Sequence, residues 1–68
     1  METIIAFETQ LTDFNKLRVE IDLTFNNDFS ILAYDEFDIW IEEYSNSLES
    51  AKQTAKALHD KIVQQYFN

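Results

Sequence analysis

The chain has 68 residues, a formal net charge of −8, and no cysteine, glycine or proline. This length allows one small domain with a marginal core, and the lack of cysteine excludes disulfides, a thiol nucleophile and a cysteine-based zinc site. The 46% hydrophobic content is too high for a disordered acidic chain, so we expect one folded domain over residues 1–68. No stretch resembles a signal peptide or approaches the roughly 20 apolar residues that span a bilayer, so we expect a cytoplasmic protein without membrane contact.

The first two elements are predicted to be strands joined by a hairpin loop. Residues 3–11 (TIIAFETQL) favour a strand with Ile5, Phe7 and Leu11 directed inward. Residues 17–25 (LRVEIDLTF) alternate strictly between apolar and polar side chains, which is typical of a strand with one buried face. Residues 12–16 are expected to close the hairpin, and residues 26–28 (NND) to form the next turn. Asparagine and aspartate suit turns in a chain without glycine because they tolerate left-handed backbone.

The next segment predicts either one long bent strand from Phe29 or two strands that meet at Asp35 and Glu36. The apolar positions expected inward are 29, 31, 33, 37, 39 and 41. A helix is predicted from about Ser47 to Tyr66, with Asn46 and Glu49 resembling a capping box. Its apolar stripe recurs at steps of three and four residues, at Leu48, Ala51, Ala55, Leu58, Ile62 and Tyr66.

A rival interpretation is a single helix from about Asp35, because Phe37, Ile41 and Tyr44 extend the stripe as a heptad-like seam. We favour the strand over residues 37–43, since isoleucine, tryptophan and phenylalanine favour strands and Ser-Asn-Ser is a poor helix interior. The predicted fold is therefore α+β. It has an antiparallel sheet of three to four strands over about residues 3–44, with one C-terminal amphipathic helix over about 47–66 packed on one face.

The negative charge belongs to the predicted sheet. Residues 1–46 carry eleven carboxylates and two basic side chains, whereas residues 47–68 carry two carboxylates and three lysines. On a strand, residues i and i+2 lie about 6.6 Å apart on the same face. Carboxylates held at such spacing offer a regular row of negative charge, as the phosphates of nucleic acids do. The acidic positions expected to meet a partner are Glu20, Asp22, Asp35, Glu36, Asp38, Glu42 and Glu43.

Two interpretations of this acidity remain open. In the first, Trp40 and Tyr34 face outward among the acids as aromatic anchors, and the chain inhibits a protein or ribonucleoprotein by occupying its basic nucleic-acid-binding groove. In the second, the charge only confers solubility. The chain is then a homo-oligomeric structural or accessory module, scaffold-like or antitoxin-like, and Trp40 is buried in a homodimer.

Catalysis is not expected. His59 is the only histidine and lies beside the predicted apolar stripe, where packing is its simplest role. The acidic run from Asp28 to Asp38 lacks the order and the glycine of a calcium-binding loop, and no glycine-rich loop could hold a phosphate. We therefore expect no metal, no cofactor and no enzyme activity. Direct binding to nucleic acid is opposed by the net charge.

In architecture and charge, the chain resembles the small acidic proteins with which phages and mobile elements block host nucleases, polymerases or defence complexes, anti-CRISPR proteins among them. The resemblance is compositional and assigns no residue. It implies a non-enzymatic inhibitor that acts in the host cytoplasm if a phage encodes it.

Overall fold

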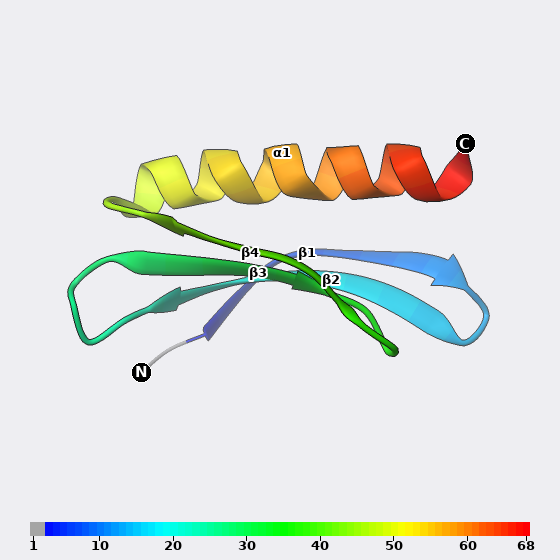
Figure 1. Ribbon diagram of the computed structural model, residues 1–68, viewed down its shortest axis with the longest axis horizontal. Helices are drawn as coiled ribbons and strands as arrows, with labels where there is room; N and C mark the ends of the chain where they lie inside the picture. Colours follow the sequence, from blue (N-terminus) through cyan, green and yellow to red (C-terminus); the bar gives the residue numbers. More distant parts are fainter. Residues whose placement is uncertain (1–2) are drawn as a thin grey trace.

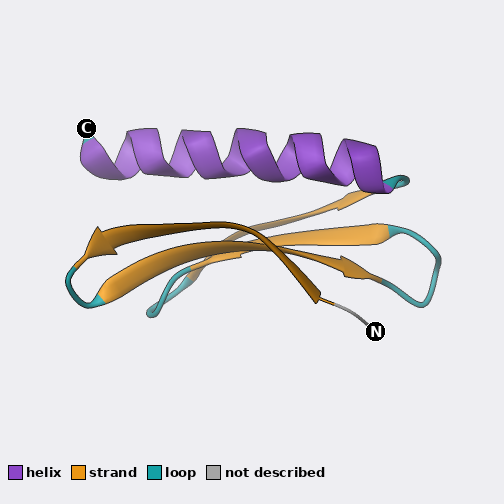
Figure 2. Ribbon diagram, turned by 180° about the vertical axis from the view of Figure 1, so that it is seen from behind, coloured by secondary structure: helices purple, strands orange, loops and turns teal. Residues whose placement is uncertain are grey.

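A four-stranded antiparallel sheet lies against one helix in the computed structural model, which describes residues 3–68. The strands are β1 (Thr3–Thr12), β2 (Asn15–Leu23), β3 (Phe29–Tyr34) and β4 (Ile39–Ser45), and the helix is α1 (Leu48–Phe67). Each strand pairs with the next one along the chain. The helix crosses one face of the sheet, and no described element covers the other face (Figures 1 and 2). This arrangement confirms the predicted α+β class and shows that residues 39–45 form a strand.

The core lies between α1 and the face of the sheet that it covers. From β2 and β3 it takes Leu17, Val19, Ile21, Ile31 and Ala33, each no more than 1% exposed. From α1 it takes the centre of the predicted stripe, Ala51, Ala55, Leu58 and Ile62. Leu11 of β1 completes the core. The two alanines lack bulky side chains, so the helix approaches the sheet closely. Leu48 and Tyr66, at the two ends of the stripe, are 36% and 37% exposed.

Irregular pairing changes which residues of β1 face the core. Ile4 pairs with Ile21 and Phe7 pairs with Val19, with a register shift between Ile5 and Phe7. Ile4 therefore lies on the core face, and the prediction that Ile5 points inward is wrong. A bulge adds one residue to a strand and so breaks the two-residue alternation on which that prediction depended.

The second and third turns also depart from the predicted alternation. β2 ends at Leu23 because Thr24 begins a turn, where its N–H donates to the carbonyl of Asp28 at 2.9 Å. Phe25, predicted inward, is consequently 94% exposed. Residues 35–38 separate β3 from β4, so the two-strand alternative is the right one. Phe37 and Ile39 are 73% and 69% exposed, which corrects their predicted inward placement.

The structure has the predicted turn at Asn27, but the N-cap of the helix is one residue later than predicted. Asn27 has a φ of 63°, the only positive value within residues 3–68, and asparagine tolerates this conformation. The helix begins one residue later than predicted. Ser47, with extended backbone, is the N-cap, and its Oγ accepts from the N–H of Ser50 at 3.1 Å. Asn46 therefore lies before the cap and does not form the predicted capping box.

Candidate protein-binding surface

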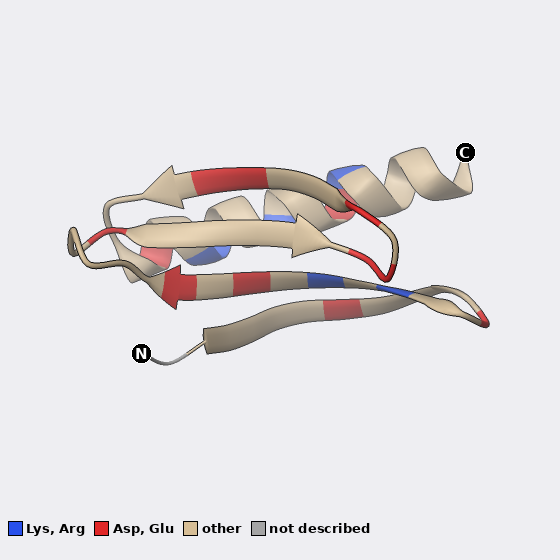
Figure 3. Ribbon diagram, turned by 60° about the horizontal axis from the view of Figure 1, so that its bottom comes forward, with Lys and Arg blue, Asp and Glu red and all other residues tan. Residues whose placement is uncertain are grey.

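The face of the sheet opposite α1, here called the open face, carries mixed acidic and apolar side chains. Strand pairing sets Glu20, Leu32 and Glu42 side by side across β2, β3 and β4. Asp22 lies two residues from Glu20, about 6.6 Å along the same strand. The charged members of the open face are Glu8, Lys16, Arg18, Glu20, Asp22 and Glu42, and its apolar or aromatic members are Ile5, Leu32, Tyr34, Ile39 and Tyr44. Figure 3 looks onto this face, with α1 behind it.

Tyr34 lies on the open face at the C-terminal end of β3 and is hydrogen-bonded to one of its acids. The hydroxyl of Tyr34 donates to the carboxylate of Glu20. This hydrogen bond, together with partial burial, raises the pKa of Tyr34 above its usual value. Tyr34 is therefore a neutral phenol held in one orientation. The predicted grouping of Tyr34 with Glu20, Asp22 and Glu42 on one face agrees with the register.

Arg18 offsets part of the negative charge at one end of the open face. Its Nε lies 3.1 Å from Glu8 Oε2, and its Nη1 lies 3.0 Å from Glu36 Oε1. The hydrogen bond to Glu36 raises the pKa of Arg18 most, and the hydrogen bond to Glu8 raises it further. Glu36 is thus partly neutralised, and the strongest unpaired acidity on this face belongs to the Glu20, Asp22 and Glu42 end.

The carboxylate of Asp35 is committed to the fold. Its Oδ1 accepts from the backbone N–H groups of Phe37 at 2.7 Å and Asp38 at 2.9 Å. Its Oδ2 accepts from the indole N–H of Trp40 at 2.8 Å and from the side-chain amide of Asn15 at 3.3 Å. Partial burial raises the pKa of Asp35, but these four bonds lower it by more, to about 2. Asp35 therefore holds the β3–β4 turn together.

Trp40 does not share the open face with Glu42 and Tyr34, which corrects the sequence prediction. A register shift pairs Ile39 with Tyr34 and leaves Trp40 as the extra residue. Its side chain lines a cavity of about 190 Å³ that is otherwise formed by Ile41 of β4 and by α1 residues Leu58, Lys61, Ile62 and Gln65. Trp40 is 39% exposed, so it closes the edge of the core and still reaches solvent.

The five-acid stretch at residues 35–43 is not one surface. Asp35, Glu36 and Asp38 lie in the β3–β4 turn, and Glu42 lies on the open face. Glu43 pairs with Ile31, whose side chain is fully buried, so Glu43 belongs to the face that α1 covers and lies at its exposed rim. The sequence predicted one surface for these acids, but alternation and the bulge at Trp40 direct them to three places.

Tyr44 and Glu8 also belong to the open face, although neither was among the predicted partner-binding residues. Tyr44, 61% exposed, pairs with Ser30 beside Asp22, and Glu8 pairs with Arg18. The signal for Tyr44 was available, because it has the same parity as Glu42 on a regular strand. The position of Glu8 depends on the register shift in β1 and had no such signal.

His59 has a packing role. Its ring stacks on Phe7 with centroids 4.9 Å apart. Its Nε2 lies 2.6 Å from Thr9 Oγ1 and its Nδ1 lies 3.0 Å from Asp60 Oδ1. These contacts fix α1 on β1, in agreement with the role expected from the sequence.

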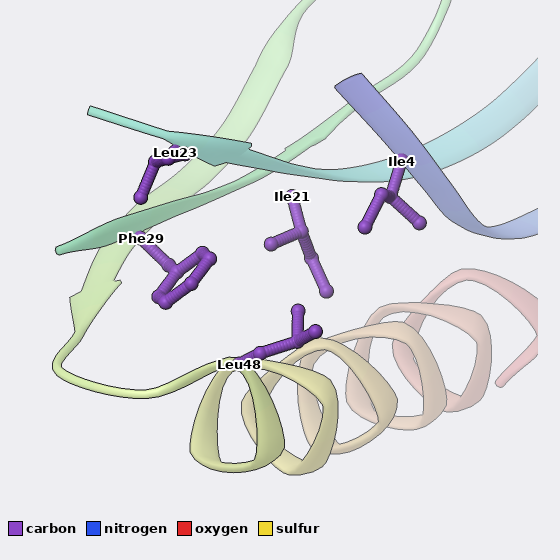
Figure 4. Close-up of a pocket in the computed structure, with 5 residues that line it drawn as sticks. All are labelled: Ile4, Ile21, Leu23, Phe29 and Leu48. Carbon is purple, nitrogen blue, oxygen red and sulfur yellow. The ribbon is translucent and has the colours of Figure 1, made fainter. Parts of the chain in front are cut away.

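Several cavities within the described part of the chain are mainly apolar. The one in Figure 4, of about 220 Å³, is lined by Ile4, Ile21, Leu23, Phe29 and Leu48 and carries no titratable side chain. Residues 3–68 contain no group of three or more potential metal ligands. Nor does this part of the chain include a helix of the length and apolarity needed to cross a membrane.

No protein-family model matches the chain, and neither a curated protein nor a solved structure is significantly similar to it. The open face therefore has to be interpreted from its own chemistry.

Proposed function

We propose that this chain is a small non-enzymatic binding protein that inhibits another protein by occupying its basic nucleic-acid-binding surface. The observation that carries the proposal is the open face, an uncovered sheet surface on which Glu20 and Glu42 flank Leu32. Asp22 extends this acidic group along β2, and Glu20 accepts a hydrogen bond from Tyr34. Aromatic and apolar side chains within a charged rim are typical of protein interfaces. The proposed partner is a protein or ribonucleoprotein with a basic groove, such as those that phages and mobile elements inactivate in their hosts.

The distribution of charge supports a directional encounter with such a partner. Three lysines belong to α1, on the far side of the sheet from the open face, whereas Glu20, Asp22 and Glu42 lie on the open face. Figure 3 shows the acidic segments of β2 and β4 in front of the helix. A basic groove would therefore attract one side of the molecule. Association steered in this way is fast at low ionic strength and slows as salt screens the charges.

The test replaces only the acids of the open face. The variant is Glu20→Gln, Asp22→Asn, Glu42→Gln. Its amide oxygens can still accept the hydrogen bonds that Tyr34 donates to residue 20 and Thr3 donates to residue 22. The matched control Asp13→Asn, Asp38→Asn, Glu49→Gln removes the same charge at exposed positions off this face. We expect the wild type and the control to capture a nucleic-acid-binding protein from lysate and to displace its nucleic acid, with both effects weakening as salt rises.

The open-face variant should neither capture the nucleic-acid-binding protein nor displace its nucleic acid. Its circular dichroism spectrum should match that of the folded wild type. If the variant captures and inhibits the same protein as well as the wild type does, the open face is not the binding surface. If no captured protein loses nucleic acid to the wild type, the proposed inhibition is wrong.

A second candidate function is a homo-oligomeric accessory module whose charge only maintains solubility. The observation in its favour is the exposure of four phenylalanines, since Phe14, Phe25, Phe37 and Phe67 are 85%, 94%, 73% and 60% exposed. Native mass spectrometry over a range of concentrations tests it. A monomer of 8.1 kDa throughout would contradict it, whereas a dimer that dissociates on Phe14→Ser and Phe37→Ser substitution would support it.

A further inference from the structure

The two edges of the sheet differ in a way that bears on strand pairing. β1 and β4 are the outer strands, so each has one row of backbone groups without a neighbouring strand. β1 is interrupted by register shifts between Ile5 and Phe7 and between Gln10 and Thr12, and such bulges twist an edge and hinder the addition of another strand. β4 has one such shift, at Trp40, and pairs with β3 without interruption from Ile41 to Ser45. It carries neither proline nor lysine. Its free edge is therefore a regular template of five residues.

We propose that the free edge of β4 binds an extended, basic segment of another protein by strand addition. Two adjacent carboxylates determine the occupant. Glu42 lies on the open face and Glu43 on the other face, both are exposed, and neither takes part in an ion pair within residues 3–68. A segment with two consecutive lysine or arginine residues would set one cation opposite each carboxylate, and opposite charges across neighbouring strands stabilise the pair.

The same carboxylates disfavour a second copy of this chain as the occupant. Antiparallel pairing of two β4 strands about their centres sets Glu42 or Glu43 of one copy opposite Glu42 or Glu43 of the other. Like charges directly opposite each other destabilise a strand pair. Acidic side chains thus protect this edge from self-association and leave it open to a basic strand.

The side chains that flank the two acids refine the occupant. Ile41 packs partly against the core and Tyr44 is exposed on the open face, so the incoming strand should carry β-branched or aromatic residues beside its basic pair. Main-chain hydrogen bonds supply affinity in this mode of recognition, and alternate side chains supply specificity.

The experiment uses the whole chain and a blocked peptide of sequence Thr-Val-Lys-Arg-Val-Thr. Titration of the isotope-labelled protein, followed by amide hydrogen exchange, should protect every second amide of residues 41–45, since alternate N–H groups of an edge strand point outward. The amides of β1 should be unaffected. A peptide with the same side chains but N-methylated at alternate residues has the same charge and lacks the backbone N–H donors. This peptide should not bind, because strand addition requires those donors.

Charge variants complete the test. We expect Glu42→Gln, Glu43→Gln to weaken peptide binding about three- to tenfold, the effect of two cross-strand charge pairs. The control Asp13→Asn, Glu49→Gln, which removes the same charge elsewhere, should bind the peptide as the wild type does. Equal binding of the N-methylated peptide, protection confined to strands other than β4, or no binding at millimolar peptide would each overturn the proposal.

Strand addition at β4 and inhibition through the open face can fail separately. The peptide experiment contains no nucleic-acid-binding protein, and the capture experiment does not monitor the β4 amides. Loss of nucleic-acid displacement with retained peptide binding would leave the β4 edge as the interaction site of a protein with another role.

Discussion

Among single residues, the carboxylate of Asp35 joins three parts of the chain. It receives donors from its own turn, from Trp40 of β4 and from Asn15 at the start of β2. Asn15 is only 4% exposed, and its Oδ1 accepts from the N–H of Glu36 at 3.0 Å. The buried amide and the carboxylate thus connect the β1–β2 and β3–β4 hairpins at one end of the sheet.

Replacement of Asp35 should destabilise the protein although the residue lies in a turn. We expect Asp35→Ala to lower the free energy of unfolding by about 2–4 kcal/mol, because charged hydrogen bonds are lost and the buried amide of Asn15 loses its acceptor. Asp35→Asn should cost less, since one oxygen can still accept from the turn. Urea denaturation measures both, with Asp38→Asn as the control, which should change stability by no more than about 0.5 kcal/mol.

The pKa of Asp35 also predicts an acid-sensitive range. The pKa is about 2 in the folded chain, compared with 3.8 for an unperturbed aspartate. Because the folded value is the lower one, Asp35 contributes its full stabilisation above pH 4, and this contribution is lost as the pH falls towards 2. Urea denaturation between pH 2 and pH 5 should show a shallower pH dependence for Asp35→Asn than for the wild type. Identical slopes would contradict this assignment.

At the scale of elements, the sequence predicted regular segments and failed at irregular ones. The alternation from Leu17 to Leu23 and the stripe from Ala51 to Ile62 lie where they were predicted, because each follows one unbroken period. The predicted sheet faces of Ile5 and Trp40 were wrong, because bulges interrupt the two-residue alternation of β1 and β4. No local pattern marks these bulges, since they arise from how two strands align.

The candidate surface was predictable to the same extent. Glu20, Asp22 and Glu42 were correctly grouped with Tyr34 because they lie within regular strand segments. The positions of Asp35 and Glu36 depended on contacts with Asn15 and Arg18 from β2, and such long-range partners cannot be derived from spacing along the chain.

The start of α1 permits a direct test between two neighbouring residues. Ser47→Ala should destabilise the protein by about 1 kcal/mol because it removes the acceptor for the N–H of Ser50. Asn46→Ala should have little effect, since Asn46 is exposed and precedes the cap. Thermal unfolding of both variants measures the difference. A larger loss for Asn46→Ala would place the cap at the residue first predicted from the sequence.

At the scale of the whole molecule, ten buried apolar residues within the described range 3–68 form the core. A chain of this length has a total stability of about 3–10 kcal/mol. Removal of a fully buried side chain costs about 2–5 kcal/mol, so Ile31→Ala should leave a large part of the population unfolded at 37 °C. Ile39→Ala, at a position 69% exposed, is the matched control and should unfold close to the wild type in calorimetry.

The excess of negative charge should make stability depend on salt. With a net charge of −8, the folded chain repels itself, and salt screens this repulsion. We expect the melting temperature to rise by a few degrees between about 10 mM and about 150 mM sodium chloride, where the Debye length falls from about 30 to about 8 Å. The variant Asp13→Asn, Asp38→Asn, Glu49→Gln should respond less. A melting temperature that falls with salt would mean that the ion pairs of Arg18 outweigh the repulsion.

The order of the elements has a consequence for synthesis of the chain. Because each strand pairs with its neighbour in sequence, the sheet closes only short loops and can form quickly. The helix that covers its apolar face is made afterwards. At synthesis rates of about 5–20 residues per second, the 20 residues of α1 take about one to four seconds to add. Until α1 packs, Leu17, Ile21 and Ile31 lack their cover, and transiently exposed apolar side chains of this kind favour aggregation.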